Sequence, residues 1–414
     1  MAGSTSNQAS TAMVEDATVR PFRVEVREEA LADLRRRVAA ARWPSKELVG
    51  DRSQGVQLAT LQALARYWAD DYDLQRVPAR LNALPQFTGE IDGQTIHFLH
   101  VRSPEPDALP LLISHGYPSS VVEFLEVVGP LSDPRAHGGE AADAFHLVIP
   151  SLPGFGFSTP VREPGWDLTR TTSAFAELMR RLGYGRYGAH GGDIGAGISG
   201  RLGATQPAHV AGVHTTSDAN GVAVGEQFGY PIPGDLSPAD LARVEEQRRK
   251  WADMKGYLDL MSTRPRTLAY SLTDSPAGQL AWIAQSFKEW TAAAADLPED
   301  AVDRDLLLAN VSIYWFTRGG ASAARFIYET AHAAADWDGG DDGEGSPADA
   351  WEVPADVVPQ GLAVFGGDDL LRKVLDPDHK MAHWTEHDRG GHFAALEVPD
   401  LLVADLRTFF RPLR

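Results

Sequence analysis

The chain has 414 residues and a formal net charge of −19, with 43% hydrophobic and 23% charged residues. These proportions are ordinary for a soluble globular protein, and the length allows one large domain with accessory segments. The negative charge disfavours nucleic acids and anionic membranes as partners. Because there is no cysteine, disulfides, thiolate metal sites and a cysteine nucleophile are excluded. No stretch approaches 18 uninterrupted apolar residues, so we predict no membrane anchor and a cytoplasmic location.

The first part of the chain predicts a leader followed by a mostly helical extension. Residues 1–19 are rich in Ser, Thr, Ala and Asn but lack the basic and apolar regions of a signal peptide, so we predict a disordered leader. Apolar residues recur at helical spacing over 31–41 and 56–69. Two short strands joined by an Asp-Gly turn follow. We therefore assign residues 20–105 to an N-terminal extension.

Buried strands that alternate with helices come next. Short apolar runs at 111–114, 145–150 and 211–216 are typical of parallel strands covered on both faces. Helical patterns lie between them, and this alternation predicts an α/β fold with a mostly parallel, doubly wound sheet. We place this core at 106–219 and 351–414.

A long segment of different character interrupts the predicted core. Residues 220–335 are rich in aromatic residues and helical periods and contain no clear buried strand, so we predict a helical cap over the functional site. Residues 336–350 are acidic and rich in glycine, which predicts a flexible loop with no site of its own.

The most informative motif is the run Tyr-Gly-Ala-His-Gly-Gly-Asp-Ile-Gly-Ala at 187–196. It has the small-x-nucleophile-x-small layout of a nucleophile elbow, a sharp strand-to-helix turn, with Asp193 where the familiar pattern has serine. The flanking positions must be small because the backbone is crowded there. A carboxylate in this place attacks carbon and forms an alkyl ester that must then be hydrolysed. The motif therefore indicates epoxide opening or halide displacement rather than cleavage of esters or peptides.

The same stretch has two other interpretations. Residues 195–200 match the G-x-G-x-x-G pattern of a dinucleotide-binding loop, and Asp218 lies near where such a fold keeps its ribose-binding acid. That pattern would indicate a nicotinamide-dependent oxidoreductase. A purely structural glycine-rich turn is the third interpretation. We prefer the elbow, because the other two leave the remaining motifs unexplained.

A second motif, His-Gly-Tyr-Pro at 115–118, directly follows the predicted strand at 111–114. A turn there can aim the backbone N–H of Tyr117 at the same space as the N–H of Ile194. Two such donors form an oxyanion hole. A simple Gly-x-Pro turn is the structural alternative.

A third motif, Gly-Gly-His-Phe, places His392 near the C-terminus. After a nucleophile elbow the expected chain order is nucleophile, acid, histidine, so we predict that His392 is the base. An apolar strand ends shortly before Asp368 and Asp369. An acid at a strand end can orient an imidazole and stabilise its cationic form, and Asp368 is the first choice, with Asp369 second. An Asp-rich turn is the alternative.

Two groups of histidines have spacings that suggest metal ligands. His379, His383 and His387 are spaced by four residues and would converge on a helix, but their surroundings better fit a strand that leads to the third motif. His97 and His100 lie three residues apart on a predicted strand, so they face opposite sides. We therefore predict no metal site and no cofactor.

Together these residues resemble the microsomal-type epoxide hydrolases of the α/β-hydrolase superfamily, including their N-terminal extension. The resemblance runs from about Pro21 to the C-terminus. It rests on segments spread along the chain, at 41–44, 81–82, 91–93, 97–100, 150–158, 263–265, 274–276 and 390–393. It implies a cofactor-free enzyme with an α/β-hydrolase fold and a helical cap.

The resemblance also implies roles for individual residues. The implied nucleophile, base and acid are Asp193, His392 and Asp368. In the cap, Tyr257 and Tyr328 match the tyrosines that donate hydrogen bonds to an epoxide oxygen, with Tyr314 as a competitor of Tyr328.

Four positions depart from the family pattern. Tyr117 and Ile194 each stand where the family usually has tryptophan. Gly366 stands where a proline usually precedes the acid. Ile327 stands where the second cap tyrosine usually lies, two residues before a glutamate.

The sequence thus predicts an epoxide hydrolase that forms a vicinal diol through an ester on Asp193, hydrolysed by water that His392 activates. A haloalkane dehalogenase would use the same triad, but it usually holds the halide with a tryptophan N–H beside the nucleophile, and Ile194 offers none. A dinucleotide-dependent oxidoreductase and a non-catalytic binding protein are the remaining alternatives.

The aromatic cap predicts a bulky apolar or aryl epoxide as the small-molecule partner, in detoxification or natural-product biosynthesis. A homodimer is possible. The Ala, Arg, Gly and Asp bias indicates a bacterial source.

Overall fold

The computed structural model describes residues 19–292, 294–295, 297–336 and 358–414. The predicted leader and the predicted acidic loop therefore lie almost entirely outside the described residues. In the part of the chain that is described, no helix has the length and apolar character needed to cross a membrane.

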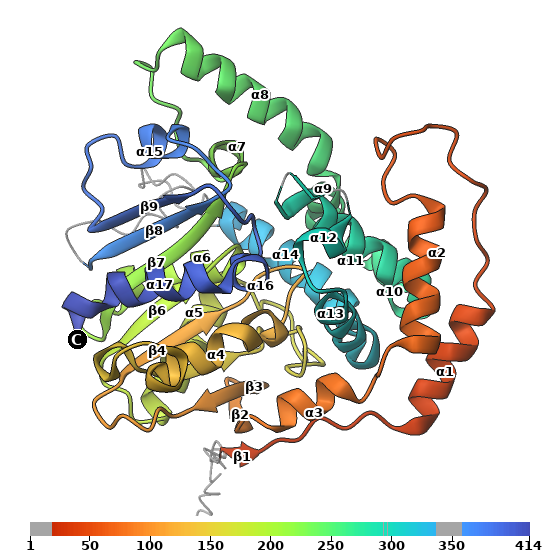
Figure 1. Ribbon diagram of the computed structural model, residues 1–414, viewed down its shortest axis with the longest axis horizontal. Helices are drawn as coiled ribbons and strands as arrows, with labels where there is room; N and C mark the ends of the chain where they lie inside the picture. Colours follow the sequence, from red (N-terminus) through yellow and green to blue (C-terminus); the bar gives the residue numbers. More distant parts are fainter. Residues whose placement is uncertain (1–18, 293, 296, 337–357) are drawn as a thin grey trace, which may run out of the picture.

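A nine-stranded sheet forms the centre of the molecule, in the order β1-β2-β3-β5-β4-β6-β7-β8-β9 (Figure 1). β1, β2 and β3 pair antiparallel with their neighbours, including β3 with β5, whereas β4 to β9 are parallel to one another. The strands are β1 Arg20–Pro21, β2 Gln86–Ile91, β3 Gln94–Val101, β4 Leu109–Ser114, β5 Phe145–Pro150, β6 Tyr187–Gly191, β7 Val210–Asp218, β8 Gln360–Phe365 and β9 His383–His387.

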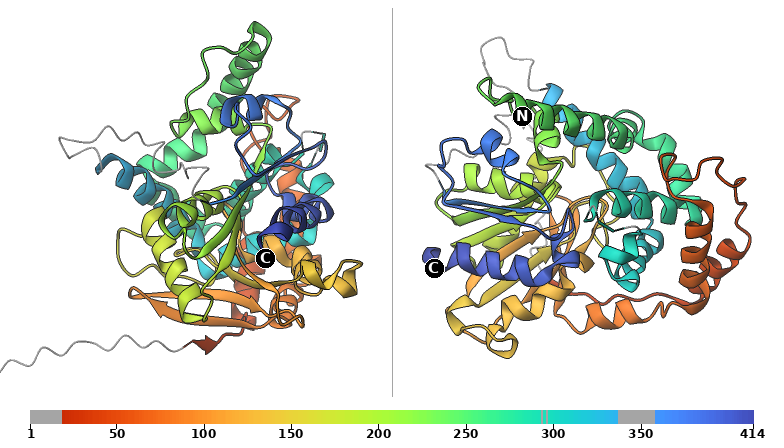
Figure 2. Two further views of the ribbon diagram at one scale, coloured as in Figure 1. Left: turned by 90° about the vertical axis from the view of Figure 1, so that its left-hand side faces the viewer. Right: turned by 45° about the horizontal axis from the view of Figure 1, so that its top comes forward.

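Helices cover both faces of the parallel part, as the apolar strands require. α5 (Leu168–Arg181) and α6 (Ile194–Thr205) lie on one face, and α4 (Leu125–Ser132) and α17 (Pro399–Phe410) on the other (Figure 2). Every residue of β5 is buried, because this strand has sheet neighbours at both edges and helices on both faces. The predicted α/β fold with a mostly parallel, doubly wound sheet is confirmed.

A run of helices lies between β7 and β8, where the sequence predicts a cap. It comprises α7 Gly221–Gln227, α8 Pro238–Met254, α9 Gly256–Thr263, α10 Pro265–Asp274, α11 Pro276–Trp290, α12 Pro298–Ala301, α13 Arg304–Thr317 and α14 Gly319–Asp336. Two of them, α8 and α11, begin at a capping side chain followed by proline: Ser237 accepts a hydrogen bond from Asp240 N, and Ser275 accepts one from Gly278 N. In Figure 1, α9 to α13 stand beside one end of the sheet, whereas α8 extends away from it.

The N-terminal helices α1 (Glu28–Ala39), α2 (Leu58–Arg66) and α3 (Arg76–Asn82) pack on the outside of the cap (Figure 1). α2 continues into a π-helical turn that carries Trp68, which is fully buried. The Trp68 indole N–H donates to Ser312 Oγ on α13 at 2.8 Å. The extension therefore holds the cap from the side opposite the sheet.

Short elements complete the chain. They are α15 Leu370–Leu375, α16 Ala394–Glu397 and the 3-10 turns Val121–Phe124, Pro134–His137, Ala141–Asp143 and Arg411–Leu413.

Candidate active site

Asp193 occupies the turn between β6 and α6. Its backbone has φ 54° and ψ −127°, a conformation that side-chain-bearing residues rarely adopt. The two flanking glycines are sterically required. A Cβ on Gly195 would lie 1.9 Å from the Ser114 carbonyl oxygen, and one on Gly191 would lie 2.4 Å from the Gly195 carbonyl carbon. The strained turn therefore presents the Asp193 carboxylate at the carboxyl end of the parallel strands.

Two backbone donors converge on one oxygen of that carboxylate. The N–H groups of Tyr117 and Ile194 donate to Asp193 Oδ1 at 2.8 and 2.7 Å. The sequence predicts this pair of donors, and the structure brings them together. Because Oδ1 is fixed in this way, Oδ2 is left as the oxygen that can attack.

His392 lies on the other side of the Asp193 carboxylate. Its Nε2 is 3.6 Å from Asp193 Oδ2, and its Nδ1 is 2.9 Å from Asp218 Oδ2. The backbone N–H of His392 donates to the Trp290 carbonyl oxygen at 2.9 Å, which ties the histidine loop to the cap. Nucleophile, imidazole and a second carboxylate thus form one line, the arrangement of a catalytic triad.

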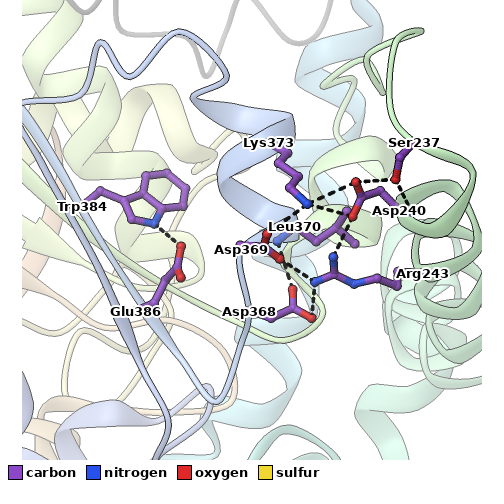
Figure 3. Close-up of polar contacts among 9 residues, drawn as sticks. All are labelled: Ser237, Asp240, Arg243, Asp368, Asp369, Leu370, Lys373, Trp384 and Glu386. Atoms are coloured by element: carbon purple, nitrogen blue, oxygen red, sulfur yellow. Dashed lines mark hydrogen bonds and ion pairs between the residues drawn. The ribbon is translucent and has the colours of Figure 1, made fainter.

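The predicted acid, Asp368, is not part of that line. Its carboxylate forms an ion pair with Arg243 of α8 at 2.5 Å, and its side chain is 58% exposed. Asp369 pairs with the same guanidinium at 2.9 Å and with Lys373. Figure 3 shows both carboxylates in this surface network, which also includes Asp240. The prediction that Asp368 or Asp369 orients His392 therefore needs correction in favour of Asp218.

The sheet explains why Asp218 takes this place. β7 is the direct neighbour of β6, and Asp218 is its last residue, so its side chain lies one strand away from the elbow. Asp368 comes three residues after the end of β8, which is one strand further away. Both aspartates satisfy the chain order of nucleophile, acid and histidine. The sequence signal that could have found Asp218 was its position at the end of the strand that follows the elbow.

The dinucleotide interpretation does not fit these positions. The glycines at 195–200 lie inside α6 and not in a loop before it. Asp218, the candidate ribose ligand, is hydrogen bonded to His392.

The charges around His392 favour its protonated form. Burial alone would lower the pKa of the imidazole, but the hydrogen bond and charge of Asp218, with the charges of Asp193 and Glu123, outweigh burial and raise the pKa to about 9. At neutral pH this raised pKa favours the cationic imidazole. Loss of the Asp193 charge would remove one cause of this elevation.

Two further carboxyl groups lie close to His392. Burial raises the pKa of Glu123 to about 7 and that of Glu397 to about 7. Glu397 accepts hydrogen bonds from Ala292 N at 2.8 Å and from Phe393 N at 3.0 Å. It therefore joins the end of α11 to the residue that follows the histidine. Sequence reasoning missed both glutamates, because neither lies in a recognisable motif.

Aromatic side chains from core and cap surround the elbow. Tyr257 of α9 stacks on Tyr117, with ring centroids 6.1 Å apart and planes 5° apart, and contacts Trp290 at 4.9 Å. Burial and the charge of Asp193 hold the pKa of Tyr257 well above its usual range. The Tyr117 hydroxyl accepts a hydrogen bond from the Trp282 indole N–H. The predicted Tyr257 is thus brought to the site, together with a second phenol.

The other predicted cap tyrosines have different surroundings. Tyr328 stacks on His332 of the same helix at 3.9 Å, and none of the contacts seen for it in the described chain reaches Asp193. Tyr314 is 1% exposed, and its hydroxyl donates to the Ser119 carbonyl oxygen at 3.0 Å. Ile327, at the expected position of the second tyrosine, is partly buried against the main hydrophobic core.

Known proteins share this architecture. The family described as "Epoxide hydrolase N terminus" matches residues 19–124, and the family "alpha/beta hydrolase fold" matches residues 110–253. The "Putative epoxide hydrolase" of Stigmatella aurantiaca is 43% identical over 96% of this chain and 86% of its own length. "Epoxide hydrolase 1" of Sus scrofa is 31% identical over 96% of this chain and 90% of its own. The structure of Aspergillus niger epoxide hydrolase matches with a TM-score of 0.78 at 28% identity, covering 97% of this chain and 98% of that chain.

Proposed function

Since the chain belongs to the epoxide hydrolase family of the α/β-hydrolase fold, we propose that it converts an epoxide to a vicinal diol through a covalent ester on Asp193. The observation that carries the mechanism is that the two oxygens of this carboxylate have different contacts. Two backbone N–H groups hold Oδ1, while Oδ2 is free and faces His392. This arrangement suits a carboxylate that is alkylated and then restored.

In the first step, Asp193 Oδ2 attacks an epoxide carbon. An ester C–O bond forms, and the bond from that carbon to the epoxide oxygen breaks. The departing alkoxide takes a proton from the phenol of Tyr257, which remains protonated at neutral pH because its pKa is raised. The Tyr117 hydroxyl is the second donor that the geometry offers. Its oxygen accepts from Trp282, and no acceptor for its proton is seen among the described residues.

In the second step, the ester is hydrolysed. Alkylation neutralises Asp193, and the pKa of His392 falls because one of the charges that raise it is lost. His392 then gives up its proton, which restores the phenol of Tyr257, and the neutral imidazole takes a proton from water. The resulting hydroxide attacks Cγ of Asp193. The N–H groups of Tyr117 and Ile194 stabilise the oxyanion on Oδ1. The Cγ–O ester bond breaks, and the departing diol oxygen takes the proton from His392, whose ring Asp218 holds in place. The new carboxylic acid of Asp193 then returns its proton to His392, which restores the resting enzyme.

The substrate class follows from the walls of the site. Tyr117, Tyr257, Trp282 and Trp290 present flat aromatic surfaces near the nucleophile. Such surfaces favour a bulky apolar or aryl epoxide over a small polar one.

The test of the covalent step is a single turnover in heavy-oxygen water. Water attacks Cγ of Asp193, and the oxygen that leaves in the diol is an unlabelled carboxylate oxygen. We therefore expect the label in the Asp193 peptide and none in the first diol, as measured by mass spectrometry. Label in the first diol with an unlabelled enzyme would show that water attacks the epoxide directly.

A separate prediction concerns the hydroxyl groups of Tyr257 and Tyr117. Tyr257→Phe and Tyr117→Phe are each expected to slow ester formation by roughly 10²-fold, the effect of removing one donor from a developing oxyanion. Tyr328→Phe serves as the matched control and is expected to change little. Rapid-quench measurement would resolve the two steps, and hydrolysis of a preformed ester should be nearly unaffected by all three. If Tyr328→Phe slows ester formation while Tyr117→Phe leaves its rate unchanged, the second donor comes from α14.

A further inference from the structure

Four histidines and one aspartate meet on the face of the sheet that α17 covers. Asp405 of α17 lies at their centre, with its side chain 2% exposed. His214 Nε2 and His383 Nε2 are both 2.8 Å from Asp405 Oδ1, and His387 Nε2 is 3.2 Å from Oδ2. Thr385 donates to Oδ2 as well. The cluster is separate from the triad, because His214 precedes Asp218 by four strand residues, about 13 Å along an extended chain.

The strand register explains why these side chains converge. His383, Thr385 and His387 alternate along β9 and therefore share one face of the sheet. His214 lies on β7, two strands away, and both His214 and His383 are register partners of Gly361 on β8. Gly361 has no side chain between them. The two imidazoles can therefore reach the same carboxylate oxygen across β8.

Asp405 has no lysine or arginine beside it in the described part of the chain. The contacts of its carboxylate there come from imidazoles and a hydroxyl. Buried carboxylates in proteins are paired with a cation or coordinate a metal, so the surroundings of Asp405 suit a positive ion.

We propose that this cluster binds a divalent transition-metal ion, zinc by preference, through His214, His383 and Asp405. The ligand atoms of these three residues lie within 4.8 Å of one another. A tetrahedral zinc ion with bonds of ~2.0–2.2 Å places neighbouring ligand atoms about 3.3–3.6 Å apart. His214 Nε2 and His383 Nε2 each lie 2.8 Å from Asp405 Oδ1, so each would move outward by roughly 0.5–0.8 Å to admit the ion. Imidazole and carboxylate are also ligands that zinc commonly uses.

His190 is placed to hydrogen bond with the proposed ligand His214. His190 Nδ1 lies 3.0 Å from His214 Nδ1 and 3.2 Å from the His214 carbonyl oxygen. Without an ion, His190 can donate to that carbonyl while His214 donates to Asp405. With an ion on His214 Nε2, the proton moves to His214 Nδ1 and is donated to His190. A metal-ligating imidazole usually has such a partner for its other nitrogen.

The ion would have a structural role. Its ligands come from β7, β9 and α17, so it would fasten the outermost strand and the C-terminal helix to the sheet. His383 and His387 are 16% and 19% exposed, which gives the ion a route in from the edge at β9. With three protein ligands, a water molecule would complete the tetrahedral shell of a zinc ion.

Cobalt is the probe for this site, because its tetrahedral complexes absorb visible light. The full chain, without a polyhistidine tag and treated with chelator, should bind about one equivalent of Co²⁺ with a tetrahedral spectrum, and Zn²⁺ should displace it and raise the melting temperature. His383→Gln and Asp405→Asn should each weaken Co²⁺ binding at least roughly 10²-fold. His383 lies on the exposed edge, so its variant keeps the test valid if Asp405→Asn fails to fold.

Two control variants decide where the ion binds. His332→Gln removes an exposed histidine on α14, and His392→Gln removes the histidine of the triad; both should bind cobalt normally. The proposal is overturned if cobalt does not bind, if His383→Gln binds it as well as the unmodified chain, or if binding is lost in His392→Gln.

Discussion

Asp218→Asn is expected to lower turnover by about 10³–10⁴-fold, the loss seen when the acid of a triad can no longer fix the imidazole tautomer or stabilise its cation. Asparagine keeps the shape of the side chain but loses the charge that helps to raise the pKa of His392. Asp368→Asn is the matched control. It breaks a surface ion pair with Arg243, whose contribution is about 0–1 kcal/mol, so turnover should be nearly unchanged.

The measurement is steady-state diol formation by both variants, with thermal melting to show that each is folded. Asp218→Asn should also lower the pKa of His392, which an NMR titration of the imidazole would detect independently of activity. The opposite pattern, with activity lost in Asp368→Asn and kept in Asp218→Asn, would show that the acid follows β8, as the family resemblance suggests.

Local chemistry determines the parts of the site that are predictable from sequence. The elbow needs small residues at fixed positions around Asp193, and the close approach of Gly195 to Ser114 shows why no larger residue fits. The Tyr117 donor follows directly from a short motif at a strand end. The alternation of buried strands and helices likewise fixes the fold class, since parallel strands require helical connections.

Contacts between distant segments explain what the sequence could not predict. Asp218 and Asp368 both follow strands, and only the order of β7 and β8 beside β6 separates them. Tyr117 and Tyr257 meet through the docking of the cap on the core, which no local pattern describes.

The histidines of β9 illustrate the same limit. His383 and His387 share one face of a strand, but their importance depends on His214 and Asp405, which come from other segments. The spacing of residues within one segment cannot show which residues of other segments contact it.

His392→Gln is expected to separate the two half-reactions. Asp193 keeps both backbone donors in this variant, so it should still open the epoxide. Water then has no base, and the ester should accumulate to about one equivalent while turnover falls by at least roughly 10²-fold. Intact-protein mass spectrometry would show the added mass of the substrate, and peptide mapping should place it on Asp193.

Asp193→Asn is the control for this experiment, because an amide at the elbow cannot form the ester and should remain unmodified. If His392→Gln also stays unmodified after long incubation, the histidine acts before the ester forms. The structure gives a reason to examine this outcome, since the raised pKa of His392 favours a cation 3.6 Å from Asp193 Oδ2, and that charge can position the nucleophile. The two variants together thus distinguish a base that acts on water from a cation that prepares Asp193 for attack.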